Sequence, residues 1–102
     1  MTAEQLEKQL QCGAAPIVLD VRSSGEFNSG HIPKAVHAPL PGVARVAATA
    51  GSKHDLFVVV CEHGPRALVA KAFLSFCGYR NLQLLEGHMS HWRSSGRPLQ
   101  GC

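Results

Sequence analysis

The feature that most constrains the fold is the stretch 58–67, where an apolar, β-branched run ends in a cysteine. It reads Val-Val-Val-Cys-Glu-His-Gly-Pro-Arg-Ala, and a helical pattern of apolar residues follows it over 67–76. This order predicts a buried strand that ends at Cys61, then a short loop and a helix. Because a helix N-terminus presents unpaired N–H groups and a partial positive charge, it favours a thiolate over a thiol. The sequence therefore predicts a reactive sulfur at the edge of a sheet.

The rest of the chain alternates predicted strands with predicted helices. Strands are predicted at 17–21, 56–60 and 81–85, with a short extended piece at 35–38, and helices at 3–11, 24–27, 43–50, 66–77 and 88–92. This alternation favours an α/β fold with a largely parallel sheet. We expect a single domain over 1–102, since the length allows one domain and no more. Chemistry in open α/β sheets gathers at the carboxyl ends of strands, where Asp20, Cys61 and Glu86 fall.

Composition narrows the classes of function. Lys and Arg total 10 and are scattered, and the net charge is +3, so the clustered basic face of a nucleic-acid groove is not predicted. No apolar run approaches the ~20 residues of a membrane helix, and the N-terminus lacks the apolar segment of a secretory signal. The four cysteines form no Cys-x-x-Cys pair. We therefore expect a cytoplasmic protein with reduced thiols, whose partners are small anions or acidic carrier proteins.

The loop that follows the cysteine has the residues of an anion-binding turn. From Cys61 to Arg66 it spans six residues, and Gly64 allows the unusual backbone angles that turn successive N–H groups inward. Pro65 suits the first turn of a helix, and Arg66 supplies a permanent charge with bidentate geometry. A thiolate ringed by N–H donors can attack a sulfane sulfur and hold the resulting persulfide.

At these residues the chain resembles the rhodanese-like sulfurtransferase family. The match is Cys-x-x-Gly-x-Arg at 61–66, and further matches occur in order along the chain, at 19–22, 26–27, 30–35, 39–40, 85–87, Trp92, Gly96 and Pro98. The resemblance covers nearly the whole chain. It implies a five-stranded, mostly parallel sheet flanked by helices.

The resemblance also assigns roles to residues. It implies that Cys61 takes a sulfane sulfur from thiosulfate or a persulfide and passes it to a thiol or cyanide, while Arg66 orients the donor. Asp20 and Arg22 match a structural Asp-x-Arg signature that ties the sheet edge to neighbouring loops. The residues beside the cysteine are candidates for contacting the substrate: Glu62, His63, Gly64, Pro65 and Ala67.

Loop length and three departures refine this expectation. Related phosphatases carry a loop longer by one residue, so the loop here favours sulfur over phosphate. Glu62 stands where many thiosulfate-using relatives carry Arg or Lys, and its repulsion of thiosulfate, on the order of a few kcal/mol at contact, leaves a persulfide as a plausible donor. Ala67 replaces a common Ser or Thr, and His88 replaces a usual second glycine after Gly87.

Other interpretations stay open at this stage. The chain can instead be a non-catalytic rhodanese-like binding or regulatory module, or, less favoured, a small phosphatase. Spacing of three between His88 and His91 allows a metal pair, but no third ligand is in view, so we expect no metal and no cofactor. We expect His31 to bond to backbone, Trp92 and Cys77 to pack in the core, and Cys12 and Cys102 to lie near surface termini. The expected partners are small sulfur donors and acceptors or a sulfur-carrier protein, with no nucleic acid and no membrane, in a monomer or weak homodimer.

Overall fold

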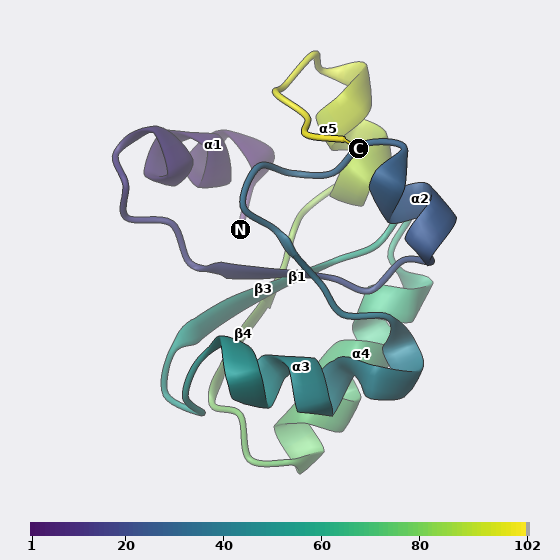
Figure 1. The fold of residues 1–102 in the computed structure, drawn as a ribbon. Helices are drawn as coiled ribbons and strands as arrows, with labels where there is room; N and C mark the ends of the chain where they lie inside the picture. The colour runs from purple at the N-terminus through teal and green to yellow at the C-terminus, as the bar shows by residue number, and fades with distance from the viewer. Residues whose placement is uncertain (102) are drawn as a thin grey trace.

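A four-stranded parallel sheet organises the chain in the computed structural model, which describes residues 1–101. The strand order is β2-β1-β3-β4, and every neighbouring pair is parallel (Figure 1). The strands are β1 (Ile17–Asp20), β2 (Val36–His37), β3 (Leu56–Val60) and β4 (Asn81–Leu84). Their carboxyl ends therefore lie along one edge of the sheet, where the candidate residues gather.

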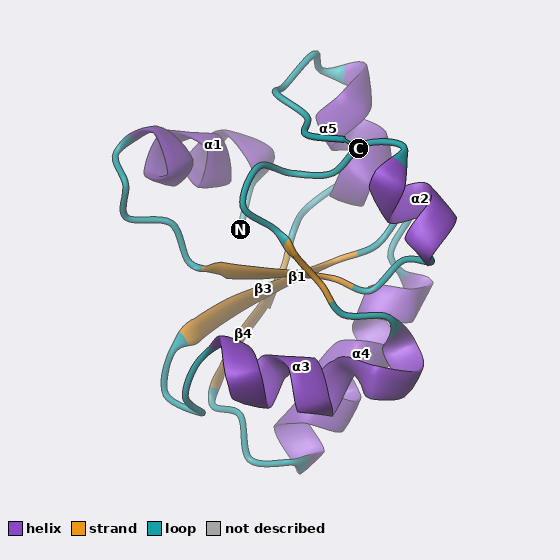
Figure 2. Cartoon of the chain, in the orientation of Figure 1, coloured by secondary structure: helices purple, strands orange, loops and turns teal. Residues whose placement is uncertain are grey.

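Helices cover both faces of the sheet. They are α1 (Ala3–Gln11), α2 (Ser24–Asn28), the 3-10 helix η1 (Leu40–Gly42), α3 (Val43–Ala50), α4 (Pro65–Phe76) and α5 (His88–Ser94). In Figure 2, α3 and α4 lie on one side of the strands, whereas α1 and α5 lie on the other. This is the layering that parallel sheets require, because both of their faces must be buried.

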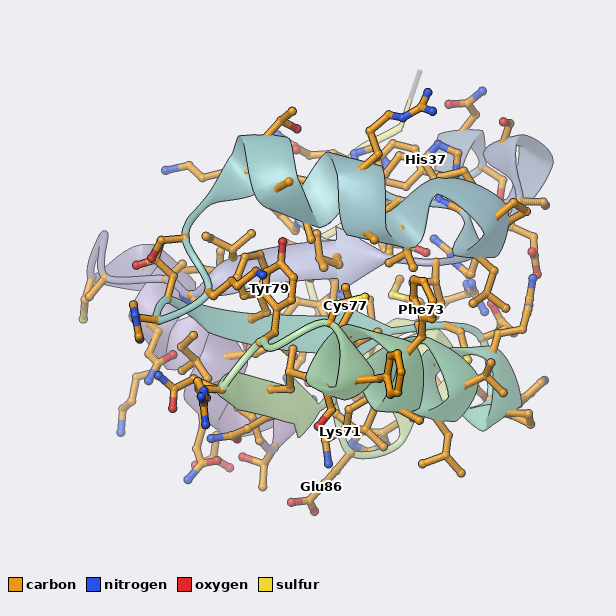
Figure 3. The ribbon with its side chains drawn as sticks, turned by 90° about the horizontal axis from the view of Figure 1, so that it is seen from below. His37, Lys71, Phe73, Cys77, Tyr79 and Glu86 are labelled. Carbon is orange, nitrogen blue, oxygen red and sulfur yellow. The ribbon has the colours of Figure 1, made fainter. Side chains whose placement is uncertain are left out.

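The alternation of side chains along β3 divides the core into two layers. Phe57 and Val59 pack with the α3–α4 side, and Val58 and Val60 pack with the α1–α5 side. All four are fully buried, which explains why the run is continuously apolar rather than alternating. Tyr79, labelled in Figure 3, packs in the α3–α4 layer, where its ring meets that of Phe57 edge-on at a centroid distance of 5.4 Å.

Local signals in the sequence account for most element boundaries. Thr2 and Gln5 form the capping box that begins α1, and Ser23 and Glu26 form a second one that begins α2. The observed α3 has the predicted bounds, and so does the observed β3. The predicted α/β architecture with a parallel sheet flanked by helices is confirmed.

The predicted number of strands, however, is wrong: the described residues form a sheet of four strands, not five. Up to residue 101, the C-terminal segment forms one isolated antiparallel bridge, between His31 and Gln100. Continuing that register would place Pro33 opposite Pro98, and neither residue has an N–H to donate to a ladder. The two prolines thus stop an additional pairing after a single bridge.

None of the helices within residues 1–101 has the length and apolar character that a bilayer crossing requires. Cys102, which was expected near a surface terminus, lies outside the described residues.

Candidate active site around Cys61

Cys61 follows the last residue of β3, and its side chain is fully buried. The chain then turns through Glu62 and His63 into Gly64, the N-cap of α4, which has φ 127°. This backbone angle lies in the region that favours glycine, and it allows the Gly64 N–H to donate to Cys61 Sγ at 2.9 Å. Pro65 occupies the first turn of α4, where its missing N–H costs nothing. The predicted strand–cysteine–loop–helix arrangement is therefore present.

The start of α5 holds the loop from its other side. Met89 N–H donates to the Cys61 carbonyl at 3.0 Å, and Ser90 N–H donates to the Glu62 carbonyl at 3.1 Å. The Cys61 N–H in turn donates to Nδ1 of His88 at 3.3 Å. His88 and Met89 thus fix both backbone groups of the cysteine, and Ser90 fixes the carbonyl of the next residue.

Arg66 is engaged with a carboxylate rather than left open. Its Nη1 and Nη2 donate to Oε1 and Oε2 of Glu26 at 2.6 and 2.9 Å, which joins α4 to α2. The hydrogen bonds from Arg66, assisted by the Ser23 backbone, hold the pKa of Glu26 well below its usual range. The same pair raises the pKa of Arg66, to which the nearby Cys61 sulfur also contributes. Arg66 is therefore within electrostatic reach of the sulfur while its fork of donors is occupied.

Glu62 lies between two arginines. Arg93 of α5 donates to both of its carboxylate oxygens, at 2.7 and 3.1 Å, and Arg22 Nη1 lies 3.4 Å from Oε1. The hydrogen bonds from Arg93, against a smaller opposing effect of burial, lower the pKa of Glu62. The negative charge that was expected to repel thiosulfate is thus offset by two cations.

A buried ion pair ties the end of β1 to the loop after α2. Arg22 Nε and Nη2 donate to the Asp20 carboxylate at 2.8–3.1 Å, and both side chains are at most 1% exposed. Arg22 Nη2 also donates to the Gly30 carbonyl at 2.8 Å. Arg22 therefore contacts the end of β1, the loop after α2 and, through Nη1, the carboxylate of Glu62.

The remaining predicted residues divide between site and core. His63 and Pro65 are exposed beside the loop, and Ala67 is fully buried under the first turn of α4. His31 bonds through Nδ1 to the Phe27 carbonyl at 2.9 Å, as expected, and Trp92 is fully buried.

The two other described cysteines and Glu86 lie apart from the loop. Cys77 ends α4 and packs against the core, and Cys12 is exposed at the end of α1. Glu86 is exposed and points away from the body of the protein in Figure 3. Within residues 1–101 no three His, Cys, Asp or Glu side chains gather as a metal site would require.

Three residues in contact with the loop were not predicted as part of the site: Glu26, His88 and Arg93. Glu26 and Arg66 are 40 positions apart, and no local pattern links them. Arg93 meets Glu62 through the packing of α5 on the loop. Two of the three carried a usable signal: Glu26 lies in a segment that matches the family, and His88 follows Gly87 where the family usually has a second glycine.

The fold and this loop define a class of protein: a parallel α/β domain whose strand-end thiol is held in a turn that opens a helix. The chain belongs to the rhodanese-like domain family, whose sequence model matches residues 2–95. Sulfurtransferase activity is supported at the level of this family by the names of its relatives.

Individual relatives cover the chain to different extents. The chain is 34% identical, over 90% of its length and 84% of the relative's, to the thiosulfate sulfurtransferase GlpE of Pseudomonas savastanoi pv. phaseolicola. It is 30% identical to the SseB protein of Mycobacterium tuberculosis, of which it spans 45%. Among solved structures, the Alr3790 protein of Anabaena sp. superposes with a TM-score of 0.92 at 26% identity, over all of this chain and 82% of that one.

Proposed function

We propose that the protein is a sulfurtransferase that carries a sulfur atom on Cys61 as a persulfide. The observation that carries this proposal is the Gly64 N–H donating to Cys61 Sγ at 2.9 Å, at a strand end that faces the start of a helix. A backbone donor directed at sulfur stabilises negative charge there without any rearrangement, which is what a thiolate nucleophile and a persulfide anion both need. The names of relatives such as GlpE support the same reaction class.

The proposed reaction has two displacements at sulfur. In the first, the Cys61 thiolate attacks the terminal sulfane sulfur of the donor, an S–S bond forms, and the donor's own S–S bond breaks. The bonding electron pair leaves with the donor, as a thiolate from a persulfide or as sulfite from thiosulfate. In the second, an acceptor thiolate or cyanide attacks the outer sulfur, and the Cys61 thiolate is released. No external oxidant or reductant is needed.

The pairing of charges around the loop supports a persulfide as the preferred donor. Arg66, Arg22 and Arg93 each contact a carboxylate, so a dianion such as thiosulfate must displace one of these pairs to gain an arginine. A small-molecule persulfide needs only the approach of its sulfane sulfur to Sγ. A small thiol or the thiol of a sulfur-carrier protein would complete the cycle as acceptor.

Intact mass spectrometry tests the proposal. The protein is incubated with glutathione persulfide or thiosulfate, desalted and weighed, and we expect the mass of one added sulfur. Cys61→Ala should gain none, whereas Cys12→Ser and Cys77→Ser should gain it as the unsubstituted chain does. Retention of the added mass in Cys61→Ala, or its absence from the unsubstituted protein with both donors, would overturn the mechanism.

A non-catalytic binding role is the second candidate, and an exposed apolar surface on α4 favours it. Leu68, Val69, Phe73 and Phe76 are 58, 58, 49 and 90% exposed, along the helix that begins at the Cys61 loop. If the protein is a binding module, a protein partner recovered in a pull-down should still bind Cys61→Ala. The unsubstituted protein should gain no sulfur from either donor. A sulfurtransferase would gain sulfur, and its transfer to an acceptor would stop in that variant.

A further inference from the structure

His88, the first residue of α5, has a backbone conformation that is unusual for a residue with a side chain. Its φ is 51°, in the left-handed region that few residues other than glycine adopt, and the residue is only 8% exposed. Non-glycine residues persist in this region when surrounding contacts determine their position. The contacts of the imidazole ring therefore indicate why His88 keeps this backbone conformation.

The ring of His88 lies against two residues of the Cys61 loop, Cys61 and Gly64. At one end, Nδ1 accepts the Cys61 N–H at 3.3 Å. At the other end, Nε2 lies 3.3 Å from the point that a Cβ on Gly64 would occupy. The ring thus lies against both residues of the contact between Gly64 N–H and Cys61 Sγ, so a shift of the ring would disturb that contact.

The bond to Cys61 also sets the protonation of the ring. Because Nδ1 accepts a backbone N–H, it carries no proton, and the proton of the neutral ring is on Nε2. Burial, and to a lesser degree the charge of His63, lowers the pKa of His88, which favours this neutral form. A doubly protonated ring would set an N–H against the Cys61 N–H and break the contact.

We propose that His88 is a positioning residue that braces the Cys61 loop, and that the rate of sulfur transfer depends on this brace. The inference rests on the proposed function for its kinetic consequence but not for the brace itself. The N–H groups of Met89 and Ser90 bond to the carbonyls of Cys61 and Glu62, and the imidazole of His88 accepts the Cys61 N–H.

Two substitutions separate the acceptor atom from the backbone conformation. His88→Gly tolerates the left-handed φ and removes the acceptor, whereas His88→Asn also tolerates this φ and places Oδ1 near the position of Nδ1. His91→Asn, an exposed change on the same helix, is the matched control. Amide hydrogen exchange at Cys61 and steady-state sulfur transfer from glutathione persulfide are measured for each, well below the unfolding temperature.

The expected result has the same order in both measurements. In His88→Gly, exchange of the Cys61 amide becomes at least about tenfold faster, and kcat falls by about tenfold with KM changed less than about twofold. His88→Asn restores both to within about threefold of the unsubstituted protein, and His91→Asn changes neither. This rescue is not expected of a residue that only fills space, because Asn is smaller than His.

The two proposals fail in distinguishable ways. Unchanged exchange of the Cys61 amide in His88→Gly overturns the brace whatever the activity. Faster exchange with an unchanged kcat overturns its role in transfer. Absence of sulfur transfer in the unsubstituted protein overturns the proposed function, while the exchange comparison still decides whether His88 braces the loop.

Discussion

Arg66 and Glu26 form a bidentate ion pair between α4 and α2, with N–O distances of 2.6 and 2.9 Å. The arginine that closes the Cys61 loop therefore has both terminal nitrogens engaged within the protein. Since both side chains are more than one-third exposed, water weakens the pair, and exchange with an incoming anion is feasible. This relationship makes Glu26 a competitor of any anionic donor for Arg66.

Replacing Glu26 by Gln should improve the use of thiosulfate. The change releases the charge of Arg66, and an exposed ion pair of about 0.2–1 kcal/mol corresponds to a KM for thiosulfate lower by about 1.5- to fivefold. Gln retains an oxygen for the capping box with Ser23, so α2 should remain folded. Steady-state kinetics with thiosulfate and with glutathione persulfide give the comparison, with Glu4→Gln as the control for loss of an exposed carboxylate. An equal change with both donors would contradict the competition.

Replacing Asp20 by Asn should destabilise the fold strongly. The change leaves the buried Arg22 guanidinium without its principal counter-charge, and breaking such a pair on one side costs about 3–5 kcal/mol. Urea denaturation followed by circular dichroism measures the free energy of unfolding. A double change of Asp20→Leu and Arg22→Met, which removes both charges, should recover a large part of the loss. A loss below about 1 kcal/mol for Asp20→Asn would show that the Gly30 and Glu62 contacts suffice for Arg22.

Replacing Gly64 by Ala should slow the loading of sulfur onto Cys61, whereas the same change at Gly25 should not. Alanine at φ 127° is strained by about 1–3 kcal/mol, and its Cβ would lie 3.3 Å from Nε2 of His88. Relief of this strain moves the N–H that reaches Sγ, so we expect sulfur loading to slow by at least about tenfold. Gly25→Ala, in α2 with open space around its added Cβ, is the control and should leave loading unchanged.

Glu62 should contribute to stability at neutral pH and lose this contribution in acid. Hydrogen bonds from Arg93 lower its pKa in the folded state, so its contribution is complete above the unfolded-state pKa of about 4.3 and is lost as the pH falls through the lower folded-state value. The difference in unfolding free energy between the unsubstituted protein and Glu62→Gln should therefore be constant from pH 7 to about pH 5 and shrink below about pH 4. Urea titrations across this range measure it, and a difference that grows in acid would have the wrong sign.

The elements that the sequence predicts best are those whose signals are local. The apolar strand at 56–60 and the helix at 43–50, which ends before Gly51, have the predicted bounds. The patterns of the sequence indicated four extended segments, and these four form the sheet, whereas the fifth strand was implied by the family resemblance alone. The C-terminal segment adds an isolated bridge whose extension would place Pro33 opposite Pro98, a relationship between segments about 65 positions apart that becomes visible only in the fold.

The same division holds for the candidate site. Cys61, Gly64 and Arg66 follow one another in a loop whose residue types already indicate a turn at a helix N-terminus. The partners of Arg66 and Glu62 come from other elements, so the sequence indicated the charges and not their pairing. His88 was noted as a departure from the family, but its role depends on a ring contact that spacing alone does not predict.

The two hydrogen bonds from α5 to the carbonyls of Cys61 and Glu62 fix the orientation of the peptide groups at the start of the loop. A trans peptide group is planar, with its C=O and the following N–H pointing in opposite directions. Because these two oxygens face Met89 and Ser90, the N–H groups of Glu62 and His63 are directed away from α5. The backbone of a neighbouring helix thereby fixes which side of the loop presents these N–H groups to an anion, independently of the charge that Arg93 brings to Glu62.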